Sequence, residues 1–130
     1  MANVEIRTDE APKPNSAYAQ AMEVRAGARV VHVSGQLGIS PEGELAEGME
    51  AQLEQAWRNV LAILKAADMT HTDIVDMKVF LTEPEGVPIA RQVRDRVLGG
   101  HLAASTLLIC GLANPAWKAE ISVTAASDRS

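Results

Sequence analysis

The sequence predicts an α+β fold, a mixed β-sheet with two helices packed on one face. Three observations lead to this prediction. The apolar residues between Gly48 and Ala67 recur at helical spacing, and residues 74–81 alternate between the two faces of a strand. The expected elements follow the order β-β-β-α-β-α-β-β, which is typical of helices segregated on one side of a sheet. With 130 residues, the chain is long enough for a single domain, residues 1–130, around one core.

Three short strands are expected before the first helix. They cover residues 4–6, 21–25 and 29–34, and a proline-containing loop separates the first from the second. Gly27 lies between the last two of these strands. Their close spacing predicts that they pair with each other as a hairpin.

The elements after the first helix and the strand at 74–81 are marked by turn signals. Pro88 suits the first turn of a second helix, because its missing N–H would be unsatisfied there anyway, and Gly99-Gly100 is expected to end that helix. Residues 106–110 read as a strand that is apolar on both faces. Residues 118–126 read as the last strand, and residues 127–130 as a frayed tail. Because helices cover only one face of the sheet, we expect another subunit to cover the other face.

Composition and charge exclude several classes of function. The formal charge of −5 argues against a nucleic-acid partner, because phosphate contacts need clustered Lys and Arg. The histidines are too scattered to suggest a metal site, and we expect no metal and no cofactor. The chain has no G-x-S-x-G, P-loop or G-x-G-x-x-G motif. It has no secretory leader and no apolar run of membrane length, so we expect a cytoplasmic protein with no membrane partner.

Cys110 is the one cysteine of the chain, so no disulfide can form within it. It ends the apolar run Leu107–Cys110. That position predicts a buried, small hydrophobic side chain, with a reactive thiol as the alternative.

Two strands carry polar residues of the kind that line a small-molecule site. In the segment Val30–Gln36, the apolar run ends at the small residues Ser34 and Gly35. The segment Lys118–Thr124 has one wholly polar face, which includes Glu120. Two such strands with a carboxylate between them predict a pocket for a small molecule.

Four segments resemble the YjgF/RidA family, in the same order and spacing. Ser16–Ala21 resembles the family's G-P-Y-x-Q-x segment, and Val33–Leu37 resembles its S-G-Q signature. The segment 51–60, with Ala-Gln at its start and Asn-Val at its end, is similar to the A-Q … N-V helix, and Lys118–Ile121 resembles the closing V-E-I-E strand.

The resemblance implies a chorismate-mutase-like homotrimer that binds a small-molecule ligand in the clefts between subunits. It also implies hydrolysis of reactive 2-imino and 2-enamino acids to 2-oxo acids and ammonia. Some family members are labelled endoribonucleases or translation inhibitors, an activity that the acidic charge of this chain argues against.

One motif of the family is absent. In deaminating members, the penultimate strand begins with P-A-R-S, and the arginine of this motif binds the substrate carboxylate. This chain reads Leu-Ala-Ala-Ser-Thr at 102–106. The arginine position falls on Ala104 or Ser105, depending on a one-residue gap. A charge-assisted hydrogen bond contributes about 1.5–3 kcal/mol, so its loss predicts poor turnover of simple 2-imino acids.

The resemblance also implies roles for individual residues. Glu120 would position or activate water, Tyr18 would close the pocket, and Ser34 would line it. Each residue also has a purely structural interpretation: Glu120 as a solvated side chain or a partner of Lys118, Tyr18 as a cap on the core, Ser34 as a strand-end hydroxyl, and Ser105 as a small packing residue.

Arg91 and Arg94 lie one helical turn apart on the second helix. They are interpreted either as a solvated helix face or as substrate-binding residues. In the second case, an arginine of this helix would bind the substrate carboxylate in place of the missing strand arginine, from another direction. Three functions remain open: an imine or enamine hydrolase, a metabolite-binding trimer without chemistry, and a pathway enzyme that uses the cleft for another hydrolysis or tautomerisation. Ammonia release from a panel of imines separates the first from the second.

Overall fold

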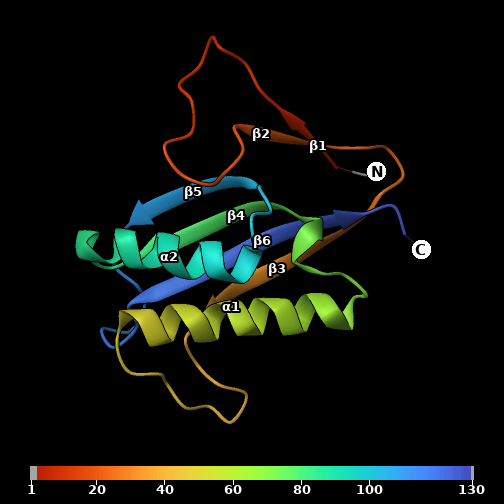
Figure 1. Ribbon diagram of the computed structural model, residues 1–130. Helices are drawn as coiled ribbons and strands as arrows, with labels where there is room; N and C mark the ends of the chain where they lie inside the picture. Colours follow the sequence, from red (N-terminus) through yellow and green to blue (C-terminus); the bar gives the residue numbers. More distant parts are fainter. Residues whose placement is uncertain (1–2, 130) are drawn as a thin grey trace.

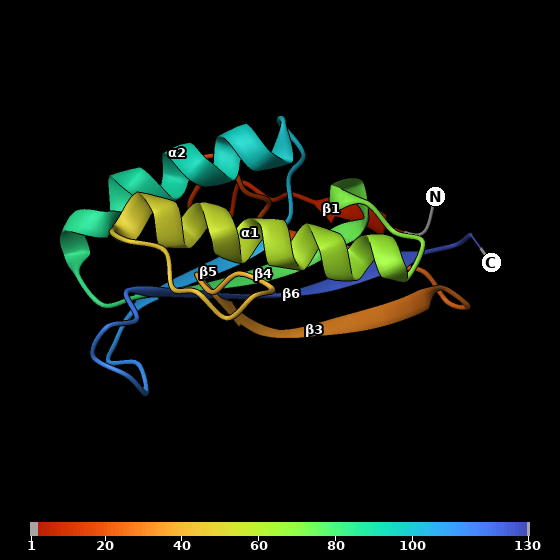
Figure 2. The same ribbon diagram turned by 90° about the horizontal axis from the view of Figure 1, so that it is seen from below.

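A computed structural model describes residues 3–129 and has the expected α+β architecture (Figure 1). The helices are α1 (Met49–Ala66) and α2 (Val87–Leu98), with two short 3₁₀ helices, η1 (His71–Asp73) and η2 (Pro84–Gly86). The strands are β1 (Asn3–Ile6), β2 (Ala21–Val24), β3 (Arg29–Leu37), β4 (Ile74–Leu81), β5 (Ala104–Ile109) and β6 (Ala119–Ser127). The main sheet has the order β3-β6-β4-β5, in which only β4 and β5 run parallel. Figure 2 shows both helices on one side of this sheet.

The core lies between the two helices and the sheet, where the sequence pattern predicts it. The apolar stripe of α1 is buried, with Leu53, Trp57 and Leu64 at 1% exposure or less. Residues 74–81 form β4 and bury alternate side chains such as Met77. Gly99 ends α2 as expected, because its φ of 56° is a left-handed conformation that glycine adopts without strain.

The predicted hairpin between residues 21–25 and 29–34 is wrong. β2 pairs antiparallel with β1 in a separate two-stranded sheet, and β3 pairs antiparallel with β6. A turn does occur at Gly27, but it carries the chain from one sheet to the other. The long ladder with β6 decides the partner of β3, because it lets Val31 and Val33 face the core while Val30, His32 and Ser34 face outward.

The prediction that Cys110 is buried is also wrong. β5 begins at Ala104, two positions earlier than expected, and ends at Ile109, so Cys110 lies just beyond the strand and is exposed. β5 is an edge strand, and nothing in residues 3–129 covers its outer face, where Leu108 is 45% exposed. The apolar run therefore marks an uncovered edge of the sheet rather than its interior.

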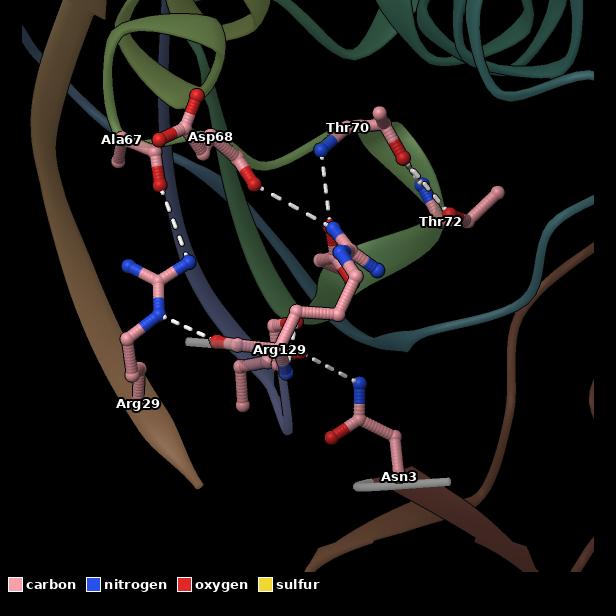
Figure 3. A network of polar contacts seen from close by, with 10 residues as sticks. Asn3, Arg29, Ala67, Asp68, Thr70, Thr72 and Arg129 are labelled. Carbon is pink, nitrogen blue, oxygen red and sulfur yellow. Dashed lines mark hydrogen bonds and ion pairs between the residues drawn. The ribbon is translucent and has the colours of Figure 1, made fainter.

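The expectation of a frayed tail fails for residues 127–129, and Ser130 lies outside the described residues. Ser127 belongs to β6 and is buried. Arg129 donates from Nη2 to the Asp73 carboxylate at 2.9 Å, and its carbonyl accepts a 2.7 Å hydrogen bond from Arg29 (Figure 3). Arg29 also bonds to the carbonyl of Ala67 at the end of α1. These bonds fasten the C-terminal segment to the loop between α1 and β4.

Candidate functional site

On the open face of the sheet, the Glu120 side chain lies directly over the backbone of Gly35. β3 and β6 lie side by side here, with an irregularity in the ladder between Val33 and Gln36. A Cβ atom at position 35 would overlap the Glu120 carboxylate, so any larger residue there would displace the end of this flexible side chain. Ser34 precedes Gly35 and is exposed. The two polar strands therefore meet as the sequence pattern predicts, with the carboxylate at their junction.

Two side chains of α1 hold the ends of these strands in place. Gln52 is 2% exposed and accepts a 2.8 Å hydrogen bond from the Lys118 N–H, while its Nε2 donates to the carbonyls of Ala46 and Ala116. Asn59 donates to the carbonyl of Leu37, the last residue of β3, and to that of Ile39, two residues beyond the strand. The A-Q … N-V pattern thus has a physical explanation, which sequence reasoning missed: its two amides connect α1 to the segments that carry Ser34 and Glu120.

The Glu120 carboxylate has no competing partner in the described part of the chain. It makes no hydrogen bond or ion pair with residues 3–129. The ammonium of Lys118, which the sequence offered as a possible partner, lies 3.5 Å from the Glu83 carboxylate instead. The lone pairs of Glu120 are therefore available to water or to a ligand.

Three other candidate residues gather on the opposite, helix-covered side of the sheet. Tyr18, Ser105 and Arg94 line one small cavity between α2 and β5, together with Arg91. A hydrogen bond from Ala19 N–H to the carbonyl of Ala103 holds the Tyr18 loop beside the start of β5. The cavity thus combines residues from the loop before β2, from α2 and from β5.

The strand register distinguishes the two candidate positions for the missing arginine. Ser105 pairs with Met77, whose side chain is in the core, and Ser105 lines the cavity. Ala104 pairs with Asp76 and therefore lies on the other face of the sheet. Only Ser105 is placed beside Tyr18 and Arg94.

The family model for endoribonuclease L-PSP matches residues 8–127. The chain belongs to the endoribonuclease L-PSP (YjgF/RidA) family. The match covers β2, the whole main sheet, both helices and all the candidate residues.

Among L-PSP relatives, a RutC family protein from Aquifex aeolicus is 41% identical over 80 residues, which are 61% of this chain and 62% of that protein. The chain thus matches less than two thirds of the length of this relative. The 2-iminobutanoate/2-iminopropanoate deaminase of Rattus norvegicus is 35% identical over 101 residues, covering 76% of this chain and 72% of the deaminase. The crystal structure of YyfB, a Rid-family protein of unknown function from Yersinia pestis, superposes with a TM-score of 0.85 at 26% identity over 98% of this chain and 100% of that chain.

In this L-PSP family member, one chain does not bring all candidate residues together. Ser34 and Glu120 lie on the open face of the sheet, whereas Tyr18, Arg94 and Ser105 lie on the helix-covered face. The first group offers a free carboxylate, and the second offers positive charge. Strand alternation is the sequence signal that separates the two groups, because alternate residues face opposite sides of a sheet. It shows which side a residue faces only once the strand partners are known.

Within residues 3–129, no three His, Cys, Asp or Glu side chains lie where they could hold one metal ion. No helix in that range is long and apolar enough to cross a membrane.

Proposed function

We propose that this chain hydrolyses imine or enamine intermediates in a pocket formed between copies of itself. The observation that carries the proposal is the unpaired Glu120 carboxylate held over Gly35, in a family that includes a 2-iminobutanoate/2-iminopropanoate deaminase. A carboxylate without a competing partner is suited to act as a general base toward water.

The chemistry requires one proton-transferring group beside the C=N bond. The imine reacts in its protonated form, C=NH2⁺. Glu120 takes a proton from water as the water oxygen forms a bond to the imine carbon, which gives a neutral carbinolamine. The same carboxyl returns this proton to nitrogen and then takes the hydroxyl proton as the C–N bond breaks and the carbonyl compound forms. That last proton passes to the released ammonia, which leaves as ammonium. An enamine gives the same protonated imine when it takes up a proton at carbon. Water is the only co-reactant.

The shared pocket is supported by the placement of the two groups of residues. In one chain, Glu120 and the arginine-lined cavity lie on opposite faces of the sheet, so neither group alone holds both charges. In the ring that we propose, the α2–β5 side of one copy lies against the open face of the next. The exposed apolar side chains Val30 and Leu108, at 47% and 45%, favour such a contact over exposure to water. We propose a homotrimer, the assembly that the family resemblance implies.

A second candidate is a trimer that binds a metabolite in the same cleft without chemistry. The specific observation that favours it is the absence of the strand arginine, because Ser105 carries no charge. Without another cation in its place, carboxylate-bearing imines would be bound weakly and turned over poorly.

Ammonia release from imines generated in situ tests the proposal. The panel contains 2-iminobutanoate, 2-iminopropanoate and an imine without a carboxylate. We expect the wild-type protein to accelerate ammonia release from at least one of them, and Glu120→Gln to abolish the acceleration because water loses its acid/base partner. Glu54→Gln, which changes a partly exposed carboxylate on α1, is the matched control. No acceleration over the whole panel, with ligand still bound, would favour the metabolite-binding trimer.

A further inference from the structure

A small cavity between α2 and β5 contains two arginines and no acidic side chain in its lining. Its volume is about 160 Å³, and it is bordered by Ser16, Tyr18, Arg91, Arg94 and Ser105. Whole-ligand pockets usually have volumes of about 300 Å³ or more. The cavity therefore has room for one end of a ligand, such as a carboxylate on a short carbon chain. The small side chain at position 105 leaves this room open.

The guanidinium of Arg94 is buried and incompletely bonded. The residue is 7% exposed. Its Nε donates to Asp95 Oδ1 at 3.0 Å and its Nη1 to the Ser16 hydroxyl at 3.3 Å. Its Nη2 lies 2.9 Å from the same Asp95 oxygen, yet it makes no hydrogen bond of acceptable geometry. This buried donor has an ion-pair partner but no well-aligned acceptor, so a ligand acceptor that reached it would be stabilised.

The charges around the cavity are unbalanced in favour of an anion. Arg91 and Arg94 both line it, and Asp95, whose side chain is 53% exposed, neutralises only one of them. Arg91 makes no hydrogen bond or ion pair with any residue from 3 to 129. This local excess of positive charge stands out in a chain of net charge −5. Partial burial strengthens the attraction for an anionic group, because the effective dielectric constant is lower than in water.

We propose that Arg94, assisted by Arg91, binds the carboxylate of the substrate and so determines specificity for short 2-imino acids. In deaminating members of the family, the arginine that binds the carboxylate lies on the penultimate strand. In this chain, α2 supplies the arginine from across the cavity. The Ser105 and Tyr18 hydroxyls border the same space and are available as further donors. This inference rests on the proposed imine hydrolysis for its substrate, but not for its test, which measures binding alone.

Calorimetric titration with 2-oxobutanoate, the stable hydrolysis product of 2-iminobutanoate, tests the inference. We expect the wild-type protein to bind 2-oxobutanoate but to bind its uncharged methyl ester poorly. Arg94→Gln should weaken 2-oxobutanoate binding by roughly tenfold or more, which is the effect of losing one charged hydrogen-bonding group, and Arg91→Gln should weaken it less. Arg96→Gln is the matched control, because Arg96 lies on the same helix but contacts Glu54 outside the cavity.

A second variant keeps the test decisive if Arg94→Gln does not fold. Ser105→Asp places a carboxylate beside the two guanidinium groups and should abolish 2-oxobutanoate binding by occupying the site. Wild-type affinity in Ser105→Asp and in the folded arginine variants would overturn the inference, as would equal binding of acid and ester. If binding depends on Arg94 but no imine releases ammonia, the inference stands and the proposed hydrolase fails. If ammonia release is rapid but 2-oxobutanoate binding depends on neither arginine, the proposed hydrolase stands and the inference fails.

Discussion

The substitution Gln52→Leu should weaken the fold because it removes a buried amide that connects α1 to the chain entering β6. Gln52 is 2% exposed and makes three hydrogen bonds: to Ala46 O at 3.1 Å, to Ala116 O at 3.2 Å, and from Lys118 N at 2.8 Å. Leucine fills a similar volume but leaves all three backbone groups without their partner.

The magnitude follows from how far water can replace the lost bonds. A buried group left unsatisfied costs about 1–3 kcal/mol. Ala116 is exposed, so its carbonyl is solvated at little cost, whereas Ala46 and Lys118 are only partly accessible. We therefore expect a loss of about 2–4 kcal/mol in the free energy of unfolding, mainly from two groups. With a urea m-value of about 2 kcal/mol/M, the unfolding midpoint should fall by about 1–2 M.

Urea unfolding followed by far-UV circular dichroism measures this change, at one protein concentration because assembly would stabilise the fold. Gln92→Leu, an exposed glutamine on α2, is the matched control and should leave the midpoint nearly unchanged. Lys118 lies two residues before Glu120, so Gln52→Leu should also reduce ammonia release by the folded protein. A midpoint shift no larger than that of Gln92→Leu would refute the assignment of Gln52 as the connection between α1 and β6.

Gly35→Ala should displace the Glu120 carboxylate and reduce ammonia release with little change in melting temperature, and unchanged kinetics would contradict the contact between these two residues. Arg129→Ala breaks the ion pair with the buried Asp73 carboxylate. It should lower the free energy of unfolding by about 1 kcal/mol or less, because the Arg129 side chain is 56% exposed. An unchanged thermal melt would show that this ion pair does not contribute to stability. Light scattering should give the mass of a trimer, and a stable monomer at micromolar concentration would remove the basis for a shared pocket. In a filter-binding assay at physiological ionic strength, the protein should not retain RNA, since its charge of −5 per chain repels phosphate; tight binding would be the contrary result.

The helices and the central strand are determined by the sequence itself. The stripe of α1, Pro88 in the first turn of α2, Gly99 at its end and the alternation in β4 are local patterns, and each holds in the structure. Local patterns survive because periodicity and turn chemistry depend on residues only a few positions apart. The family was also recognisable from the sequence, because its motifs combine in a fixed order.

The candidate site could be predicted only as a set of residues, without their arrangement. The meeting of Glu120 with the Ser34-Gly35 segment was foreseeable from two polar strands, but the close contact between the carboxylate and Gly35 was not. Arg94 illustrates the same limit, because a helix pattern offers no way to tell a solvated arginine from a buried one. Its bond to Ser16 joins residues 78 positions apart.

Tertiary structure alone decided which strands pair and which side chains share a cavity. The partner of β3 is β6 rather than the neighbouring β2, Cys110 is exposed at a sheet edge, and Arg129 is tied to Asp73. Each of these outcomes depends on contacts between distant segments, and a strand's own sequence carries little information about its partner. The sequence by itself therefore determined the elements and the family of this protein. The packing of α2 on the sheet decided that Arg91 and Arg94 face Ser105, because only the completed fold brings the three together.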